Sequence, residues 1–310
     1  MRNNDIQPIS ERLNPAVSAL FFFLAAMISF VVIGPLIGTI IVMLNFDGDL
    51  MDLMNKLQDP VGDSAFKTNM FILQGSATGI GLILLPWVYI RFINGKRLSF
   101  LSHGRSLELQ PVLVMMFSVI AFMVVNSYFI EWNSNISMPE SMSGVEQWMR
   151  QSEDQAARLT EYMTTFDTMG QFLFALLVIG VLPSIGEELV FRGYLQRELG
   201  IAFNSPHLAI WLSAAIFSAI HMQFFGFVPR LLLGALFGYM YYWSGNLKYP
   251  MIAHFVVNGG QVCLLYMVQR GVTDIDMESN ESFPIWIIIL FSVITFGLLF
   301  YFRRTFRENS

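Results

Sequence analysis

Eight apolar stretches divide this chain and constrain its fold more than any other feature. A helix needs about 20 apolar residues to cross the hydrocarbon core of a bilayer, and most of these stretches approach that length. Backbone polar groups cannot stay unpaired in hydrocarbon, so a chain that crosses it does so as helices or as a closed barrel. The predicted spans cover residues 16–44, 71–89, 111–130, 170–185, 208–219, 231–243, 250–268 and 284–302.

Composition supports the same fold class. Only 13% of the 310 residues are charged, against about 25% in soluble domains. We therefore expect an all-α, polytopic membrane helix bundle of about eight transmembrane helices, with residues 1–310 as a single domain. The first stretch is too long for a signal peptide and is interpreted as a retained span. Small-residue spacings predict close helix approaches at Gly34/Gly38, Gly75/Gly79 and Gly234/Gly238.

The remaining composition excludes several functions and predicts an orientation. A single cysteine, Cys263, precludes an intramolecular disulfide, and no basic tract supports nucleic-acid binding. With both termini on one side, 12 of the 18 Lys and Arg residues fall on that side, which predicts that both termini are cytoplasmic. The same orientation predicts that Glu187 and Glu188 lie near the cytoplasmic end of the fourth span. The helical spacing of apolar residues over 145–162 predicts a helix outside the spans, either on the membrane surface or in solvent.

Ionisable residues inside three of the later spans are the strongest functional signal, because charge in hydrocarbon is costly. Glu188 and Arg192 lie four residues apart and share a helix face, while Glu187 points about 100° away from Glu188. The next helix carries Phe217 and His221 at the same spacing. His254 and Asn258 repeat it two spans later. The bundle can therefore gather three polar stripes around one buried site.

Such a set of side chains suits hydrolysis. A carboxylate and a histidine can deprotonate water directly, or they can hold a metal that acidifies bound water. A second histidine and an amide can donate hydrogen bonds to a developing oxyanion. Taken singly, each element has a structural explanation: a solvated helix end for Glu187 and Glu188, and interhelical hydrogen bonding for His254 and Asn258. Together they indicate a shared site.

The three spacings, in this order on successive spans, resemble the motifs of the CPBP family. That family contains the CAAX prenyl endopeptidases of the Rce1 type and bacteriocin-processing or bacteriocin-immunity (Abi) proteins. The resemblance covers roughly residues 170–265, the motif-bearing core. It implies the following roles: water activation by Glu187 and His221, an oxyanion hole from His254 and Asn258, and support of the site by Glu188, Arg192 and Phe217.

The sequence leaves several alternatives open. Glu187, His221 and His254 could supply three ligands to a catalytic zinc, but His254 cannot be both ligand and oxyanion donor, so a water activated without a tightly bound metal is favoured. The expected activity is an endopeptidase acting near the cytoplasmic face of a bacterial cytoplasmic membrane. Its partners would be the lipid bilayer and a peptide or membrane-protein substrate. The competing hypotheses are a non-catalytic scaffold or immunity-type protein, and a proton-coupled transporter, which the lack of repeated halves disfavours.

Overall fold

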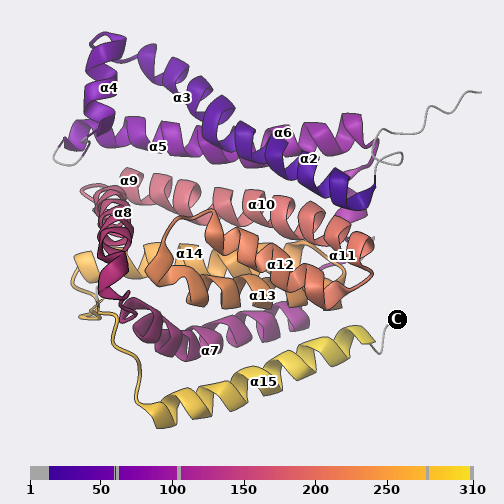
Figure 1. Cartoon of the computed structure of the whole chain (residues 1–310). Helices are drawn as coiled ribbons and strands as arrows, with labels where there is room; N and C mark the ends of the chain where they lie inside the picture. The colour runs from indigo at the N-terminus through magenta and orange to yellow at the C-terminus, as the bar shows by residue number, and fades with distance from the viewer. Residues whose placement is uncertain (1–13, 59, 61–62, 103–105, 277–278, 308–310) are drawn as a thin grey trace, which may run out of the picture.

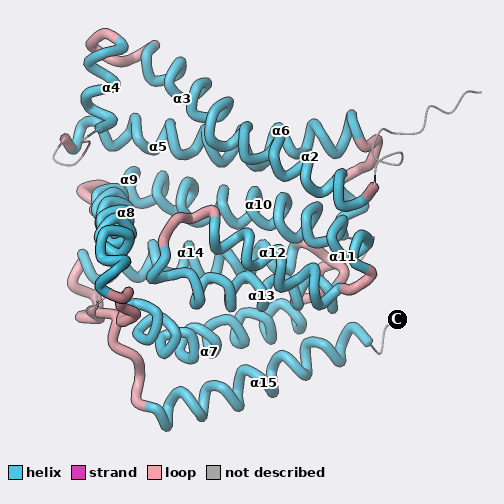
Figure 2. The backbone as a smooth tube through the Cα atoms, viewed as in Figure 1, coloured by secondary structure: helices cyan, strands magenta, loops and turns pink. Residues whose placement is uncertain are grey.

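A computed structural model describes residues 14–58, 60, 63–102, 106–276 and 279–307. Every regular element within these ranges is helical (Figure 2), which confirms the predicted fold class. The helices are α2 (Pro15–Ile28), α3 (Gly34–Met43), α4 (Leu50–Gln58), α5 (Lys67–Ser76), α6 (Leu85–Val88), α7 (Leu109–Ser134), α8 (Ser143–Thr164), α9 (Met169–Ala175), α10 (Leu182–Glu188), α11 (Arg197–Phe203), α12 (Pro206–Ala219), α13 (Phe227–Ser244), α14 (Lys248–Gln269) and α15 (Ile285–Arg307).

Several of these helices join into longer membrane-spanning units through π-helical stretches. In the described part of the chain, seven helical units are long and apolar enough to cross a bilayer. The helix α12, of 14 residues, is apolar but shorter. The protein is therefore an integral, multi-pass membrane protein, and the expectation of about eight helices is close to the structure. The seven units are Pro15–Met43, Lys67–Ile93, Leu109–Ser134, Met169–Phe203, Phe224–Ser244, Lys248–Gln269 and Ile285–Arg307.

Local sequence signals set the helix ends around the motif-bearing region. Thr168 caps α9, because its side-chain oxygen accepts a hydrogen bond from the Gln171 amide. At the other end of this unit, Asn204 adopts a left-handed conformation (φ 48°), which asparagine tolerates at a helix C-terminus. Ser205 then caps α12, and Pro206 occupies its first turn, where a missing N–H costs nothing. These residues produce the tight connection that makes α11 and α12 neighbours.

The bundle has two distinct ends (Figure 1). The start of α2 and the end of α15 lie at one end, called here the terminal end. The helices α4 and α8 lie across the opposite end, called here the α8 end. The helix predicted at 145–162 is α8, and its surface is mostly exposed. The charge asymmetry used for orientation includes Arg2, Arg12 and Arg105, which lie outside the described residues.

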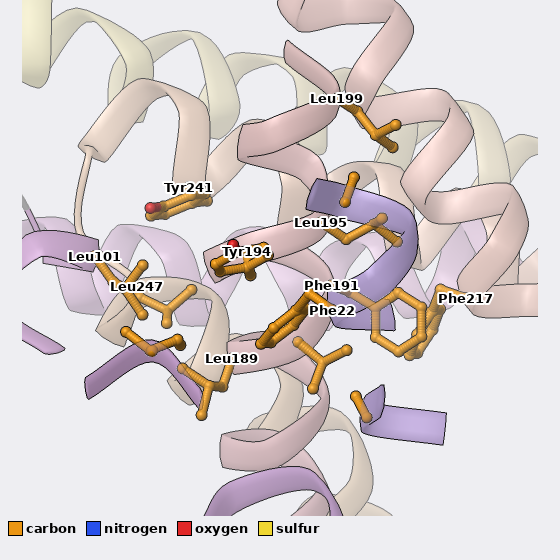
Figure 3. Packing of buried hydrophobic residues seen from close by; sticks show 14 of the residues in the cluster. Phe22, Leu101, Leu189, Phe191, Tyr194, Leu195, Leu199, Phe217, Tyr241 and Leu247 are labelled. Carbon is orange, nitrogen blue, oxygen red and sulfur yellow. The ribbon is translucent and has the colours of Figure 1, made fainter. Parts of the chain in front are cut away.

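Apolar side chains from distant segments hold the motif-bearing helix in place (Figure 3). Phe22 of α2 stacks on Tyr194, with ring centroids 3.8 Å apart. Phe191 packs edge-to-face on Phe217 of α12 at 5.2 Å. Because aromatic rings bury large apolar areas, these contacts are a major part of the packing around the helix. The first helical unit is thus built against the segment that carries Arg192.

The first two helical units, Pro15–Met43 and Lys67–Ile93, approach each other so closely that only glycine fits at two positions. A Cβ atom on Gly81 would lie 2.5 Å from the Cα of Phe30, and one on Gly34 would lie 2.7 Å from the Cα of Ala77. The prediction of a close approach is wrong for Gly75 and Gly79, whose Cβ atoms would make only ordinary contacts, at 3.4 Å or more. Gly81, which the spacing pattern missed, is therefore the tighter position.

Replacing Gly81 with alanine is expected to lower the thermal unfolding midpoint in detergent. The added methyl group meets backbone atoms, which cannot rotate away, and such overpacking costs about 1–3 kcal/mol. Gly79→Ala is the matched control two residues away, with its nearest atom at 3.9 Å. Equal midpoints for the two variants would contradict this description of the helix contact.

Candidate active site

A fully buried ion pair lies at the centre of the motif-bearing region. Arg192 donates to Glu188 through Nη1 at 2.8 Å, and the two side chains are 1% and 0% exposed. The Nδ1 atom of His254 hydrogen-bonds the same Glu188 oxygen at 2.8 Å. The other terminal nitrogen of Arg192, Nη2, donates to the backbone oxygen of Gly234 at 2.9 Å. The structure therefore joins α10, the π-helical stretch after it, α13 and α14 through one carboxylate.

Aromatic rings enclose this network and keep it apart from lipid. The Arg192 guanidinium lies 4.6 Å from the ring centre of Phe217 and 5.6 Å from that of Phe237. Phe237 also stacks on His254, at 5.4 Å and 24°. Cations over aromatic faces are attracted by the ring quadrupole, most strongly when desolvated. Phe217 and Phe237 thus cover two sides of the network with apolar surface that also attracts its positive charge.

Glu187 and His221 are placed differently from the buried pair. Both are only partly buried, and the carboxylate of Glu187 has no hydrogen bond within the described residues. Its Oε2 atom lies 3.8 Å from the Nε2 atom of His254. His221 donates from Nδ1 to the backbone oxygen of Phe217 at 2.7 Å, and it interacts electrostatically with Glu187. A neutral His221 held this way leaves Nε2 as a proton acceptor.

A proline explains where Asn258 sits. Pro183 has no N–H, so the carbonyl of Ile179, four residues earlier, loses its normal helical donor. Asn258 of α14 fills this role, since its Nδ2 atom lies 3.4 Å from the Ile179 oxygen. The second N–H of the amide group remains to serve another acceptor. The proline thus provides the anchor for a motif residue on another helix.

The position of the site along its helix differs from the sequence prediction. Glu187 lies 18 residues after the start of the Met169–Phe203 unit and 16 before its end, about 27 Å from its start. It therefore lies near the middle of the helix and not near one end. The sequence prediction ended the span at residue 185 because polar residues follow. The structure instead buries Glu188, Arg192 and Gln196 among neighbouring helices, so the helix continues.

The side chains of Glu187, His221 and His254 are not arranged as the ligands of a metal ion. Among the residues that the structure describes, no three His, Cys, Asp or Glu side chains are grouped so that they could hold a metal ion. Glu187 and His254 approach each other, but His221 does not complete the set. A catalytic zinc usually takes three protein ligands, so the arrangement does not fit the candidate zinc site of Glu187, His221 and His254.

Sequence reasoning missed a second arginine beside the site. Arg230, in the first turn of α13, donates from Nη2 to Gln223 Oε1 at 2.6 Å. It interacts electrostatically with both Glu187 and Glu153 of α8. The signal was present in the sequence, because Arg230 is an ionisable residue at the margin of an apolar span. Its relation to Glu187 became visible only in three dimensions.

Comparison with known proteins agrees with the motif-bearing region. Residues 169–260 match the family described as "Type II CAAX prenyl endopeptidase Rce1-like". A Bacillus subtilis (strain 168) protein, described as "Uncharacterized protein YpbD", is 31% identical over 113 residues, which make up 34% of this chain and 55% of that relative. The match thus spans about half the length of the relative. No solved structure matches this chain.

All three motifs fall inside the matched residues, from Glu187 to Asn258. The structure brings six of their side chains into one connected group around Glu188, and Asn258 lies one turn beyond His254. Sequence resemblance and tertiary geometry therefore point to the same residues. Residues 169–260 of this integral membrane protein are thus similar to the Rce1-like family of type II CAAX prenyl endopeptidases, as the three motifs indicated.

Proposed function

We propose that this protein is a membrane-embedded endopeptidase in which Glu187 and His221 activate a water molecule. The observation that carries the proposal is the contrast between the two adjacent glutamates. Glu188 is fully buried and bonded to Arg192 and His254, whereas Glu187 is 16% exposed and has no hydrogen bond to the described residues. A carboxylate with free acceptor oxygens beside a histidine is suited to remove a proton from water.

The hydrolytic step follows from these positions. The Glu187 carboxylate accepts a proton from water, and His221, through Nε2, accepts a hydrogen bond that orients the same water. The water oxygen bonds to the scissile carbonyl carbon, whose π electrons move onto its oxygen. As the tetrahedral intermediate collapses, the C–N bond breaks and the proton held by Glu187 passes to the departing nitrogen. No step requires a group beyond the chain, the substrate and water.

The oxyanion of that intermediate is stabilised by donors on α14. The free amide N–H of Asn258 is one donor. His254 donates from Nε2 when its imidazole carries both protons, with Nδ1–H held by Glu188. Arg192 and the aromatic rings position this assembly without touching the substrate.

Asn258→Ala is expected to lower kcat about 10²–10³-fold, as removal of one oxyanion donor does in other hydrolases. KM should change little, because the hydrogen bond forms fully only in the transition state. The matched control is Asn126→Ala on α7, which removes another buried asparagine side chain outside the site. A loss of activity that is equal in both variants would show that Asn258 acts only through stability.

The buried network also suits the competing scaffold hypothesis, in which polar residues only hold helices together. Glu188, Arg192 and His254 bond one another and the backbone of Gly234 across three helical units, which is what a scaffold requires. Glu187 adds only a longer contact to that network, 3.8 Å from His254 Nε2, and His221 hydrogen-bonds only within its own turn. Their partial exposure therefore favours chemistry over structure.

The proposal is tested by comparing protein N- and C-termini across the proteome in three strains. The strains lack the gene, carry the wild-type gene, or carry His221→Ala expressed at the same level. We expect the same set of termini to disappear in the deletion and in the His221→Ala strain, which would also identify the substrates. If the His221→Ala strain matches wild type while the deletion differs, the endopeptidase proposal is wrong.

The substrate class that fits is a peptide or membrane protein whose scissile bond reaches the interior of the bundle. The family name includes CAAX prenyl endopeptidases, which makes a C-terminal, lipid-modified tail one candidate, and a leader peptide another. The bilayer is the second partner in either case. For location, a bacterial cytoplasmic membrane with both termini in the cytoplasm remains the expectation from the Lys and Arg distribution.

A further inference from the structure

A cavity lies at the terminal end of the bundle, apart from the candidate active site. Its volume is about 490 Å³, and its walls come from the start of α11, the first turn of α12 and the end of α13. These segments meet at the terminal end (Figure 1). Gln196, the wall residue nearest to Glu187 in sequence, follows it by about 13 Å along the helix. The catalytic proposal therefore leaves this cavity without a role.

The inner wall of the cavity is buried and polar. Gln196 and Tyr241 line it and are 7% and 6% exposed. The Nε2 atom of Gln196 donates to the backbone oxygen of Gly238 on α13, at 3.1 Å. Arg197 also lines the cavity, is partly buried and interacts electrostatically with Tyr241. The inner wall thus places a guanidinium beside a phenol between α11 and α13.

The charge at the cavity is positive. Among the described residues that line it, Arg197 is the one cation and none is acidic. A guanidinium carries five N–H donors and matches the oxygens of a phosphate in bidentate geometry. The guanidinium of Arg303 on α15 lies 6.0 Å from the ring centre of Trp243, another residue of the wall. Glu198 interacts with Arg197 but also with Ser18 of α2, and it does not line the cavity.

The outer rim of the cavity lies at the level of the lipid headgroups. Ile201 and Tyr242 line it and are 57% and 48% exposed. Tyr241, Tyr242 and Trp243 occupy the last turn of the Phe224–Ser244 unit, and tyrosine and tryptophan are favoured where hydrocarbon meets headgroups. The Lys and Arg excess predicts that this end faces the cytoplasm, where the leaflet carries anionic lipids and basic pockets between helices bind their headgroups.

We propose that this cavity binds the headgroup of an anionic phospholipid, with the Arg197 guanidinium donating to its phosphate oxygens. The acyl chains leave the cavity over its exposed rim, where Ile201 offers them apolar surface. A free phosphate ion would meet the same guanidinium but would gain nothing from the apolar rim. The proposal goes beyond the endopeptidase function and does not depend on it.

A bound headgroup would strengthen the contact between the motif-bearing helix and α13. Gln196 bonds the backbone of Gly238, and Arg192, one turn earlier, bonds the backbone of Gly234, one turn earlier on α13. The cavity and the buried ion pair therefore lie at successive turns of the same helix contact. Because the headgroup would touch both helices at Arg197 and Tyr241, it should bind the folded protein only and raise its unfolding midpoint.

Thermal unfolding of the purified protein in dodecyl maltoside micelles tests the proposal. Palmitoyl-oleoyl phosphatidylglycerol, phosphatidylcholine with the same chains, or inorganic phosphate is added in rising amounts. We expect phosphatidylglycerol to raise the midpoint to a plateau, and the other two to raise it far less. Arg197→Gln should increase the phosphatidylglycerol needed for half of this shift about tenfold, as for the loss of a charge-assisted hydrogen bond. The matched control is Arg91→Gln, which removes an exposed charge at the same end, outside the cavity, and should leave the half-point unchanged.

A second variant tests the cavity without removing the charge. Gly200 lines it, and a Cβ atom there would meet only the Cβ of Ala209, at 3.8 Å. Gly200→Leu should therefore fold normally, fill the cavity and lose the phosphatidylglycerol shift. Phosphatidylcholine or inorganic phosphate as effective as phosphatidylglycerol would overturn the assignment to an anionic lipid, as would a wild-type midpoint that phosphatidylglycerol leaves unchanged. A shift that persists in Gly200→Leu, or that weakens equally in Arg91→Gln and Arg197→Gln, would overturn the cavity as its location.

Discussion

Replacing Glu187 with glutamine is expected to abolish cleavage while leaving the protein folded. A general base contributes about 10²–10⁴-fold to the rate, and an amide cannot accept the proton from water. Folding should persist, because glutamine has the same shape and Glu187 makes no hydrogen bond to the described residues. The measurement is single-turnover cleavage by purified protein of a substrate identified from the changed termini, with the thermal unfolding midpoint recorded in parallel.

The matched control for this variant is Glu153→Gln. Glu153 interacts with the same Arg230 but lies on α8, away from the reacting water. It should retain cleavage within about tenfold, because only the attachment of α8 is weakened. Wild-type cleavage by the Glu187→Gln protein would remove Glu187 from the mechanism. A protein that unfolds on this substitution would instead support a purely structural role.

Replacing Arg192 with methionine is expected to produce the largest loss of stability. Removing one partner of a buried ion pair costs about 3–5 kcal/mol, because the other charge is left uncompensated. Here Glu188 would stay buried with His254 alone, and the carbonyl of Gly234 would lose its side-chain donor. Methionine retains much of the apolar bulk between Phe217 and Phe237, so the loss reports mainly on charge. The measurement is the free energy of unfolding in mixed micelles.

A double variant distinguishes charge from packing in this prediction. Glu188→Gln together with Arg192→Met removes both charges and should recover part of the lost stability, because no unpaired ion remains. The double variant should still lack activity, since His254 loses the carboxylate that holds its Nδ1 proton. If the double variant is less stable than Arg192→Met alone, the ion pair is not what stabilises this part of the bundle.

The two predictions differ because adjacent glutamates have different environments. Glu188 accepts hydrogen bonds from residues four and 66 positions away and is fixed by them. Glu187 lies on a different face of the same helix, where no such partner exists among the described residues. Substitution at Glu188 or Arg192 therefore affects folding first, and substitution at Glu187 affects chemistry first. In a scaffold protein, substitution at Glu187 would also affect folding first, as it does at Glu188 or Arg192.

Much of the fold was predictable from hydrophobicity. All eight predicted stretches correspond to helices, and the helix predicted at 145–162 is α8. The fourth apolar stretch ended at residue 185, too short for a span unless the following polar residues enter the membrane, and the helical unit indeed runs on to Phe203. Hydrophobicity alone does not give the length of this extension, because Arg192 and Gln196 are accommodated there by hydrogen bonds to Glu188 and to the backbone of α13.

The candidate site was predictable in its membership but not in its arrangement. Spacings of four residues placed Glu188 with Arg192 on one face, and the structure pairs them at 2.8 Å. The same spacing said nothing about His254 Nδ1 bonding Glu188, or about Asn258 bonding the carbonyl that Pro183 leaves free. Those contacts join different helices, and no local pattern encodes the rotation of one helix against another.

The sequence by itself determined that this protein is a multi-pass helix bundle with an Rce1-like set of polar residues. It could do so because unpaired backbone and charge are costly in hydrocarbon, which ties composition directly to helices and to polar sites within them. The tertiary structure alone decided that Glu188 is buried and bonded while Glu187 stays partly accessible. Both depend on which side chains from distant helices fill the space around each carboxylate, and that is set by packing of the whole bundle.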